Sequence, residues 1–370
     1  MDMPTQNKTI YTYDANAAAD PNSGVFGLPY SYEDSQLVFL PVPWEATTSY
    51  GGGTAHGPEA ILNASSQIDL FDLDVLNPDR AGLHCLDIDP AIVKLNDRAK
   101  KTAQTIKDAY GVIDGHSELI ANLKLVNELS GELNAWVKGK ISSILKDGKI
   151  AALIGGDHST PFGAFEAVAE HFGEFGILHI DAHSDTRKAY MGFEHSHASI
   201  MYNAATKIPK IKTITQVGIR DFCDEEFSFT QSRKHQFNVF FDQMISAHRL
   251  NGKPFNELLT RIVDTLPQQV WVSFDIDGLD PRYCPHTGTP VPGGIDYSEA
   301  VMLLRMVAKS GRKILGFDLN EVAPILDEQG LPAEINQAAD EWDANVGMRL
   351  LYKLSALTLA SQKKSAWRET

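Results

Sequence analysis

The 370-residue sequence predicts a single α/β domain of three layers, in which a parallel sheet of about eight strands lies between two layers of helices. Two observations lead to this prediction. Short runs of β-branched, aliphatic and aromatic residues alternate along the chain with segments of helical periodicity. Several of these runs are apolar along their whole length, which is typical of parallel strands that helices cover on both faces.

The chain begins with residues 1 to about 35, which are rich in Asp, Asn, Ser, Pro and Gly with scattered aromatic residues. We expect this segment to be an N-terminal arm that lies over the domain or over a neighbouring subunit, and residues 36–370 to form one domain. The expected strands are, in order, Leu37–Val42, His84–Ile88, Ile150–Ile154, Phe175–Ile180, Thr213–Ile219, Asn238–Phe241, Val270–Ile276 and Ile314–Leu319.

Start and stop signals mark helices between several of these strands. Pro58 precedes an apolar helical face, so a helix is expected to begin there. The segment His116–Lys146 has helical character, with an expected break near Gly131. Asp296 and Glu299 have the spacing of a capping box and predict the start of a further helix.

Composition and charge exclude several classes of protein. Lys plus Arg number 33 against 48 Asp plus Glu, and the resulting formal charge of −15 repels phosphate backbones and anionic membranes. We therefore expect neither a nucleic acid nor a membrane as partner. No apolar segment approaches the ~20 residues that span a bilayer, and the chain starts without a signal-peptide pattern. The three cysteines are too few and too scattered for a disulfide framework, which indicates a cytoplasmic protein.

Metal-capable side chains follow three of the expected strands. They are His158, Asp181, His183, Asp185, Asp275 and Asp277. Because ligands of parallel sheets bind beyond the carboxyl ends of the strands, we expect these side chains to converge there. Mixed His and Asp ligation suits Mn²⁺, Ni²⁺, Zn²⁺ or Fe²⁺, and the set exceeds what one tetrahedral centre requires. The sequence therefore predicts two bridged divalent metal ions, which can lower the pKa of a shared hydroxide toward neutrality.

Each motif also has a structural interpretation. Taken alone, Asp275 and Asp277 could belong to a Mg²⁺ site or cap a helix, and His158 could be a residue of a helix-capping loop. His197 lies in a polar loop after the metal segment and is a candidate proton shuttle. Glu321 follows another apolar strand, where it could bind a planar cation or have a capping or surface role.

Together these motifs resemble those of the ureohydrolase superfamily of arginases and agmatinases. The matching segments are Gly-Gly-Asp-His-Ser at 155–159, Asp-Ala-His-Ser-Asp at 181–185, Ser-Phe-Asp-Ile-Asp-Gly-Leu-Asp-Pro at 273–281, Thr-Pro-Val-Pro-Gly-Gly at 289–294 and Glu-Val-Ala-Pro at 321–324. Their order and spacing match over about residues 36 to 360. The resemblance implies an arginase-type fold with all six candidate ligands on a pair of metals. It also implies that Asp185 relays a proton, that His197 is the proton shuttle and that Glu321 binds the guanidinium group.

The resemblance further implies hydrolysis of a guanidino C–N bond with release of urea. The loop between residues 181 and 200 lacks the Asn-rich pattern with which arginases hold an α-amino acid, and it looks more like the agmatinase-type branch. Within that branch, the arm and the segment from Pro41 to Thr54 look similar to the nickel-dependent guanidine hydrolases, in which an arm and aromatic residues narrow the pocket. Trp44 and Tyr50 would line the pocket here, although both could equally pack beneath a glycine turn.

The leading expectation is therefore that free guanidine is hydrolysed to urea and ammonia with two Ni²⁺ ions, and Mn²⁺ is the alternative metal. Agmatine, which would give putrescine and urea, and guanidino acids such as guanidinobutyrate are the alternative substrates. The resemblance also implies a homotrimer or homohexamer, and it leaves open a need for accessory proteins that load the metal. Two other classes stay open: a non-catalytic metal-binding scaffold, and a phosphoester hydrolase, which would need Lys or Arg beside the metals.

Overall fold

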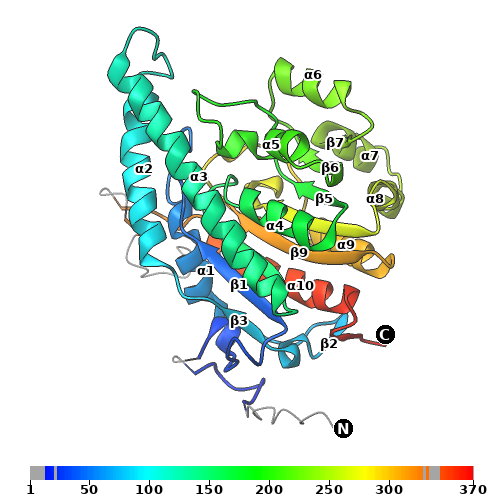
Figure 1. The fold of residues 1–370 in the computed structure, drawn as a ribbon. Helices are drawn as coiled ribbons and strands as arrows, with labels where there is room; N and C mark the ends of the chain where they lie inside the picture. Colours follow the sequence, from blue (N-terminus) through cyan, green and yellow to red (C-terminus); the bar gives the residue numbers. More distant parts are fainter. Residues whose placement is uncertain (1–12, 21–22, 328–330, 333–341, 370) are drawn as a thin grey trace.

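The computed structural model describes residues 13–20, 23–327, 331–332 and 342–369. Its centre is one parallel sheet of eight strands in the order β3-β1-β4-β9-β8-β5-β6-β7 (Figure 1). The strands are β1 (Leu37–Val42), β3 (Leu83–Cys85), β4 (Ile150–Gly155), β5 (Phe175–Ile180), β6 (Ile211–Ile219), β7 (Phe237–Phe241), β8 (Gln269–Asp275) and β9 (Lys313–Asn320). The predicted fold class and the predicted strand number agree with this sheet.

Helices cover both faces of the sheet. One layer consists of α2 (Pro90–Asp108), α3 (Ser117–Lys146), α4 (Phe162–Phe172) and α5 (Ile200–Lys207), and α6 (Asp224–Ser232) lies beside β7. The other layer consists of α1 (Gly57–Ser65), α7 (Asp242–Leu250), α8 (Phe255–Asp264), α9 (Tyr297–Lys309) and α10 (Trp342–Ser361). Short 3₁₀ helices are η1 (Val25–Gly27), η2 (Thr54–His56), η3 (Pro78–Ala81), η4 (His197–Ser199) and η5 (Ile276–Gly278).

Side chains of each strand alternate between two apolar cores. On β1, Leu37 and Phe39 belong to the core under α1 and α10, whereas Val38 and Leu40 belong to the core under α3 and α4. This alternation follows from the period of two residues in a strand, and it explains why the strands are apolar along their whole length.

The structure corrects three details of the sequence analysis. The predicted break near Gly131 is wrong, since α3 is continuous and its contacts with α2 and α4 offset the roughly 1 kcal/mol that glycine costs in a helix. The strand predicted at His84–Ile88 corresponds to β3. It ends at Cys85, because Asp89 caps α2 shortly afterwards. A small antiparallel sheet of β2 (Val75–Leu76) and β10 (Ala366–Trp367) was not predicted, since two residues carry no periodicity. The capping box of Asp296 and Glu299 at α9 is confirmed.

Part of the expected arm is buried in the main core. Val25 and Phe26 of η1 are only 4% and 2% exposed. The ring of Phe26 contacts Phe39 of β1 and Tyr352 of α10 edge-on, with centroid distances of 5.9 Å and 5.1 Å. The division into an arm before residue 36 and a domain after it stays a prediction, but packing of the core already involves η1.

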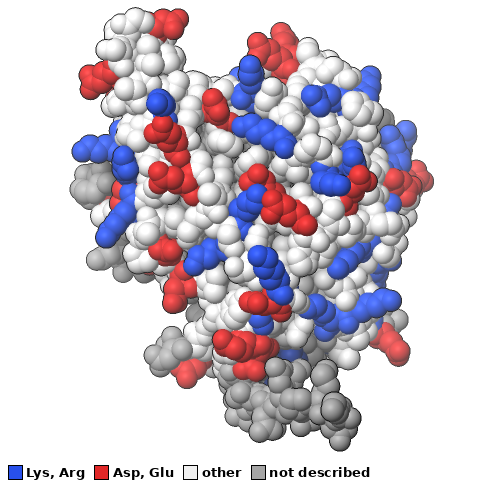
Figure 2. All heavy atoms as spheres, viewed as in Figure 1, with Lys and Arg blue, Asp and Glu red and all other residues white. Residues whose placement is uncertain are grey.

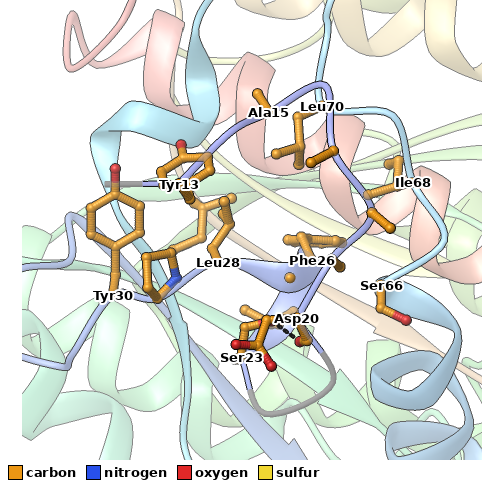
Figure 3. Close-up of a pocket in the computed structure, with 18 of the residues that line it drawn as sticks. Tyr13, Ala15, Asp20, Ser23, Phe26, Leu28, Tyr30, Ser66, Ile68 and Leu70 are labelled. Atoms are coloured by element: carbon orange, nitrogen blue, oxygen red, sulfur yellow. Dashed lines mark hydrogen bonds between the residues drawn. The ribbon is translucent and has the colours of Figure 1, made fainter. Parts of the chain in front are cut away.

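The arm also borders a cavity of about 990 Å³. Figure 3 shows Tyr13 and Tyr30 on one side of this cavity and Ile68 and Leu70 on the other. The lining comes from the arm, the segment after α1 and the end of β3, so this cavity is separate from the edge of the sheet where β4, β5 and β8 end.

The surface in the view of Figure 2 carries Lys and Arg interspersed with Asp and Glu, so the acidic excess is not concentrated on that face. In the part of the chain that the structure describes, no helix combines the length and the apolar character needed to cross a membrane.

The burial of Phe26 leads to a stability prediction. Phe26→Ala should lower the free energy of unfolding by about 3–5 kcal/mol, because it leaves a cavity between the arm and the core. Phe71, which is 68% exposed, is the matched control, and Phe71→Ala should stay within about 0.5 kcal/mol of the unmodified protein. Urea denaturation measures both. Equal effects of the two substitutions would mean that η1 contributes nothing to the core.

Candidate metal centre

The carboxyl ends of four adjacent strands bring the predicted metal ligands together. In the sheet, β4, β9, β8 and β5 are neighbours. His158 follows β4, Asp181 follows β5, Asp275 ends β8 and Glu321 follows β9. All four side chains are buried, so the sheet concentrates charge where little water reaches it.

His158 lies at the centre of a first group of donor atoms. Its Nδ1 lies 2.9 Å from Asp181 Oδ2 and 3.2 Å from Asp275 Oδ2. The same nitrogen lies 3.5 Å from Asp185 Oδ2. His158, Asp181 and Asp185, together with His179, offer atoms that all lie within 4.8 Å of one another, a spacing that a single cation can bridge.

His183 lies in a second group. Its Nδ1 is 3.1 Å from Asp277 Oδ2 and 3.5 Å from Asp181 Oδ1. These three residues also offer atoms within 4.8 Å of one another. Because Asp181 belongs to both groups, its two oxygens could be shared by two neighbouring cations. The structure therefore brings all six predicted ligands into one cluster.

The protonation behaviour of the cluster fits bound cations. Burial and the charge of Asp181 raise the pKa of Asp185 well above its usual range, and burial and the charge of Asp277 do the same for Asp275. Burial alone would lower the pKa of His158, but its hydrogen bond to Asp181 and the neighbouring carboxylates outweigh burial and raise that pKa to about 9. Without cations, the cluster thus binds protons that offset the charge of its carboxylates. A donor set with this need for positive charge is suited to divalent metal ions.

One residue of the cluster and the neighbouring Glu321 have a strained backbone. Asp185 has φ +53° and Glu321 has φ +63°, in the left-handed region that costs a non-glycine residue of order 1–3 kcal/mol. The carbonyl of Asp185 accepts hydrogen bonds from Met201 and Tyr202 at the start of α5. The N–H of Glu321 donates to the carbonyl of Gly156 at 2.8 Å. These hydrogen bonds keep the backbone of both residues in the strained conformation, which sets the position of the two carboxylates.

A buried histidine that the sequence analysis did not single out supports Asp181. Gln216 Nε2 donates to the carbonyl of Ser184 at 2.7 Å and to His179 Nδ1 at 3.0 Å. This network assigns the proton of His179 to Nε2, which donates to Asp181 Oδ2 at 2.7 Å. The sequence signal that could have identified His179 is its position as a polar residue within the otherwise apolar β5.

A second supporting network orients His158. Its Nε2 lies 2.9 Å from Ser273 Oγ, which donates to Asp318 Oδ2 at 2.8 Å. Asp318 is a fully buried carboxylate of β9 that also accepts a hydrogen bond from Trp271. The network keeps Nδ1 of His158 facing the carboxylate cluster, as an outer-shell partner of a metal ligand does.

A cavity of about 140 Å³ opens onto the cluster. His183, Asp185 and His197 line it beside the cluster, and the exposed residues Tyr50 and Asp221 line it toward solvent. A small molecule in this cavity would lie against the proposed ligands.

His197, the predicted proton shuttle, lines this cavity and is half-buried. Burial and the charge of His183 lower the pKa of His197 to about 3, so its ring is neutral near pH 7. The preceding loop is anchored by Phe193, which is fully buried against Ala103 of α2 and Val126 of α3. The geometry thus presents a neutral imidazole to both the cavity and solvent.

Glu321 lies beside the cluster but is not among the residues that line the cavity. Its Oε1 accepts a hydrogen bond from the N–H of His158 at 2.9 Å, whereas the buried Oε2 has no hydrogen-bond partner among the described residues. Burial and the charges of Asp275 and Asp157 raise the pKa of Glu321 well above its usual range. An unpartnered buried carboxylate oxygen is a suitable acceptor for a cationic N–H group.

The two aromatic residues predicted to line the pocket differ in position. Tyr50 is 63% exposed and borders the cavity. Trp44 is fully buried in the core under α3 and does not border the cavity. The carbonyl of Trp44 accepts a hydrogen bond from the N–H of Asp157, so this residue supports the loop that carries His158.

Known proteins resemble this chain in sequence and fold. Residues 35–352 match the model of the Arginase family. A Thermus thermophilus protein named N(1)-aminopropylagmatine ureohydrolase is 32% identical over 297 residues, which is 79% of this chain and 84% of that protein. An agmatinase of Proteus mirabilis is 30% identical over 309 residues, which is 82% of this chain and 85% of that protein. The solved structure of proclavaminate amidinohydrolase from Streptomyces clavuligerus has a TM-score of 0.67 at 23% identity and covers 94% of this chain and 100% of its own.

These comparisons confirm the predicted single-domain arginase-type fold and the predicted class of enzyme, a hydrolase of C–N bonds in linear amidines. The family match covers all four strand ends that form the metal cluster. This chain therefore belongs to the Arginase family, in the agmatinase-type branch of the ureohydrolases.

Proposed function

We propose that this protein hydrolyses the guanidino group of agmatine or of a closely related guanidino amine to urea and an amine. The observation that carries the proposal is the single buried cluster of two histidines and four aspartates at the floor of a small cavity. Relatives named agmatinase and N(1)-aminopropylagmatine ureohydrolase support an amine substrate over free guanidine, the leading expectation from sequence.

The six clustered residues are proposed to hold two divalent cations, and Asp181 belongs to both groups of donors. When bound, the cations would supply Lewis acidity that generates hydroxide near neutral pH. Mn²⁺, the usual metal of the superfamily, is the first choice and Ni²⁺ the alternative. Histidine and aspartate ligands suit both ions, so the donor set leaves this choice to experiment.

Glu321 is proposed to bind the guanidinium group. Its buried Oε2 accepts no hydrogen bond from the part of the chain that the structure describes, and a planar guanidinium offers N–H donors to such an oxygen. Gly288 lies opposite, where a Cβ atom would come within 3.2 Å of Oε2. A side chain at position 288 would therefore crowd the space that a substrate needs beside Glu321.

Asp185 and His197 are proposed to move the protons. In the overall reaction water adds its oxygen to the guanidino carbon, the C–N bond to the alkylamine breaks, and the leaving nitrogen gains a proton. Asp185 borders the cavity, so its carboxylate lies where it can pass a proton to the leaving nitrogen. His197 lines the cavity and is half-buried, so its ring lies where it can exchange protons between the cavity and solvent.

Free guanidine is the second candidate substrate. The cavity of about 140 Å³ is small, and Tyr50 borders it toward solvent, as expected for a narrow pocket. None of the described residues of the arm, 13–20 and 23–35, lines this cavity, so narrowing by the arm has no support within one chain. The resemblance also implies a homotrimer or homohexamer and leaves open accessory proteins for metal loading, and both remain part of the proposal.

The decisive experiment is a urea-release assay with the purified protein loaded separately with Mn²⁺ and Ni²⁺. Agmatine, guanidine, guanidinobutyrate and L-arginine are the test substrates. We expect agmatine to give the highest kcat/KM and L-arginine the lowest. Preferred turnover of guanidine would establish the second candidate, and absence of urea under every condition would leave a metal-binding scaffold.

Metal content tests the proposed ligands directly. His183→Ala and Asp277→Ala should each reduce bound metal from about two ions per chain toward one and abolish turnover, because each removes a donor from the second group. His235→Ala, at an exposed histidine outside the cluster, should retain both ions. Full metal content and activity in either cluster variant at saturating metal would contradict the two-metal assignment.

His197 is tested by separating turnover from metal binding. His197→Asn should lower kcat by about 10²-fold or more, the usual contribution of a positioned proton-transfer group, with metal content unchanged. Atomic absorption and steady-state kinetics measure the two quantities on the same sample. Loss of metal would instead assign His197 to the ligand set.

A further inference from the structure

The charged residues around the cavity of the metal centre are not equivalent. Arg187 Nε lies 3.5 Å from Glu226 Oε2, and the guanidinium of Arg187 also lies over the ring of Tyr190. Glu226 is buried and accepts hydrogen bonds from the N–H groups of Thr186 and Cys223. Arg187 and Glu226 therefore offset each other, and neither presents an uncompensated charge to a ligand.

Asp221 differs from this pair. Its side chain is 67% exposed and borders the cavity. Within the described ranges of the chain, the nearest cationic group is Nε2 of His183 at 3.9 Å, which is at the limit of an ion pair. Because His183 faces Asp277 through Nδ1, a metal bound there would leave Asp221 beside a neutral ring. Among the residues that the structure describes, Asp221 then contributes a negative charge that forms no other ion pair.

The backbone holds Asp221 in place. Its N–H donates to the carbonyl of Ala182 at 3.0 Å, and Asp221 forms a parallel bridge with His183. The segment after β6 is thereby tied to the segment after β5 that carries the metal ligands. The backbone of Asp221 thus has a fixed place relative to the reacting end of the cavity.

Aromatic residues border the same part of the cavity. Phe222 is 37% exposed and Tyr50 is 63% exposed, and both line the cavity with Asp221. Aromatic faces accept both methylene groups and ammonium ions. A carboxylate in a cavity that exposed aromatic residues also line matches an alkyl chain that ends in an ammonium group, and it repels a chain that ends in a carboxylate.

We propose that Asp221 determines specificity by binding the ammonium group at the far end of a guanidino amine, so that guanidino amines are preferred over guanidino acids. This inference rests on the proposed function, because it takes the guanidinium group to lie at the metal centre. It adds the residue that distinguishes amine from acid substrates.

The test compares substrates with different tails on the metal-loaded protein. Asp221→Asn keeps an acceptor for His183 and removes the charge. It should raise KM for agmatine about fivefold, the upper range for an exposed ion pair, with kcat within about twofold and metal content unchanged. Hydrolysis of guanidine, which has no tail, should not change. Inhibition of agmatine hydrolysis by guanidinobutyrate should strengthen, and Asp221→Lys should increase both effects.

Salt gives an independent readout. KM for agmatine should rise with NaCl concentration in the unmodified protein, because added ions screen an exposed charge pair. The Asp221→Asn variant should lack this dependence. Glu225→Gln is the matched control, since it removes the same charge from an exposed residue that does not line the cavity. Its KM values should equal those of the unmodified protein.

Failure of the inference can be told apart from failure of the proposed function. If Asp221→Asn and Glu225→Gln alter KM for agmatine equally, or if turnover of all substrates falls alike, Asp221 has no part in specificity. If no guanidino compound gives urea, the proposed function is wrong. Calorimetric titration with agmatine then still decides the role of Asp221, because equal affinity of the unmodified protein and Asp221→Asn would overturn it.

Discussion

The structure depends on keeping several carboxylates close together in a buried place. Loss of hydration and mutual repulsion both oppose this arrangement, and both raise the pKa of Asp185 and Asp275 above the usual range. The fold meets it in two ways. Adjacent parallel strands hold the side chains rigidly, and imidazoles placed among the carboxylates share the available protons. Divalent cations would complete the balance, so metal binding and the geometry of the sheet edge are physically linked.

Support for this cluster extends into the sheet itself. His179 and Asp318 lie on the strands rather than after them, and each fixes the orientation of one residue of the cluster. The strained backbones of Asp185 and Glu321 show that the surrounding structure sets the local conformation there, against the intrinsic backbone preference of these residues.

The sequence was most informative for features that a hydrophobic pattern or a fixed motif spacing determines. Apolar strands and the ligands that follow them can be found from sequence because the C-terminal ends of parallel strands must share one edge. Gly131 shows the limit for helices, since the contacts that keep α3 continuous come from α2 and α4 and leave no local signal. Trp44 shows the limit for the site. Whether an aromatic residue after β1 faces the core or the cavity depends on the path of a loop that no periodicity describes.

The strand order has a consequence for how the site comes into being. His158 and Asp181 follow consecutive strands of the chain, β4 and β5, yet β9 and β8 lie between those strands in the sheet. Both intervening strands come from the C-terminal part of the sequence. During synthesis, a chain that already contains His158, Asp181, His183 and Asp185 cannot bring them together until β8 and β9 have been made and inserted. Such long-range parallel pairing is intrinsically slow. The metal centre is therefore among the last features that a newly made chain can form, and an incomplete chain has most of the ligands without a site.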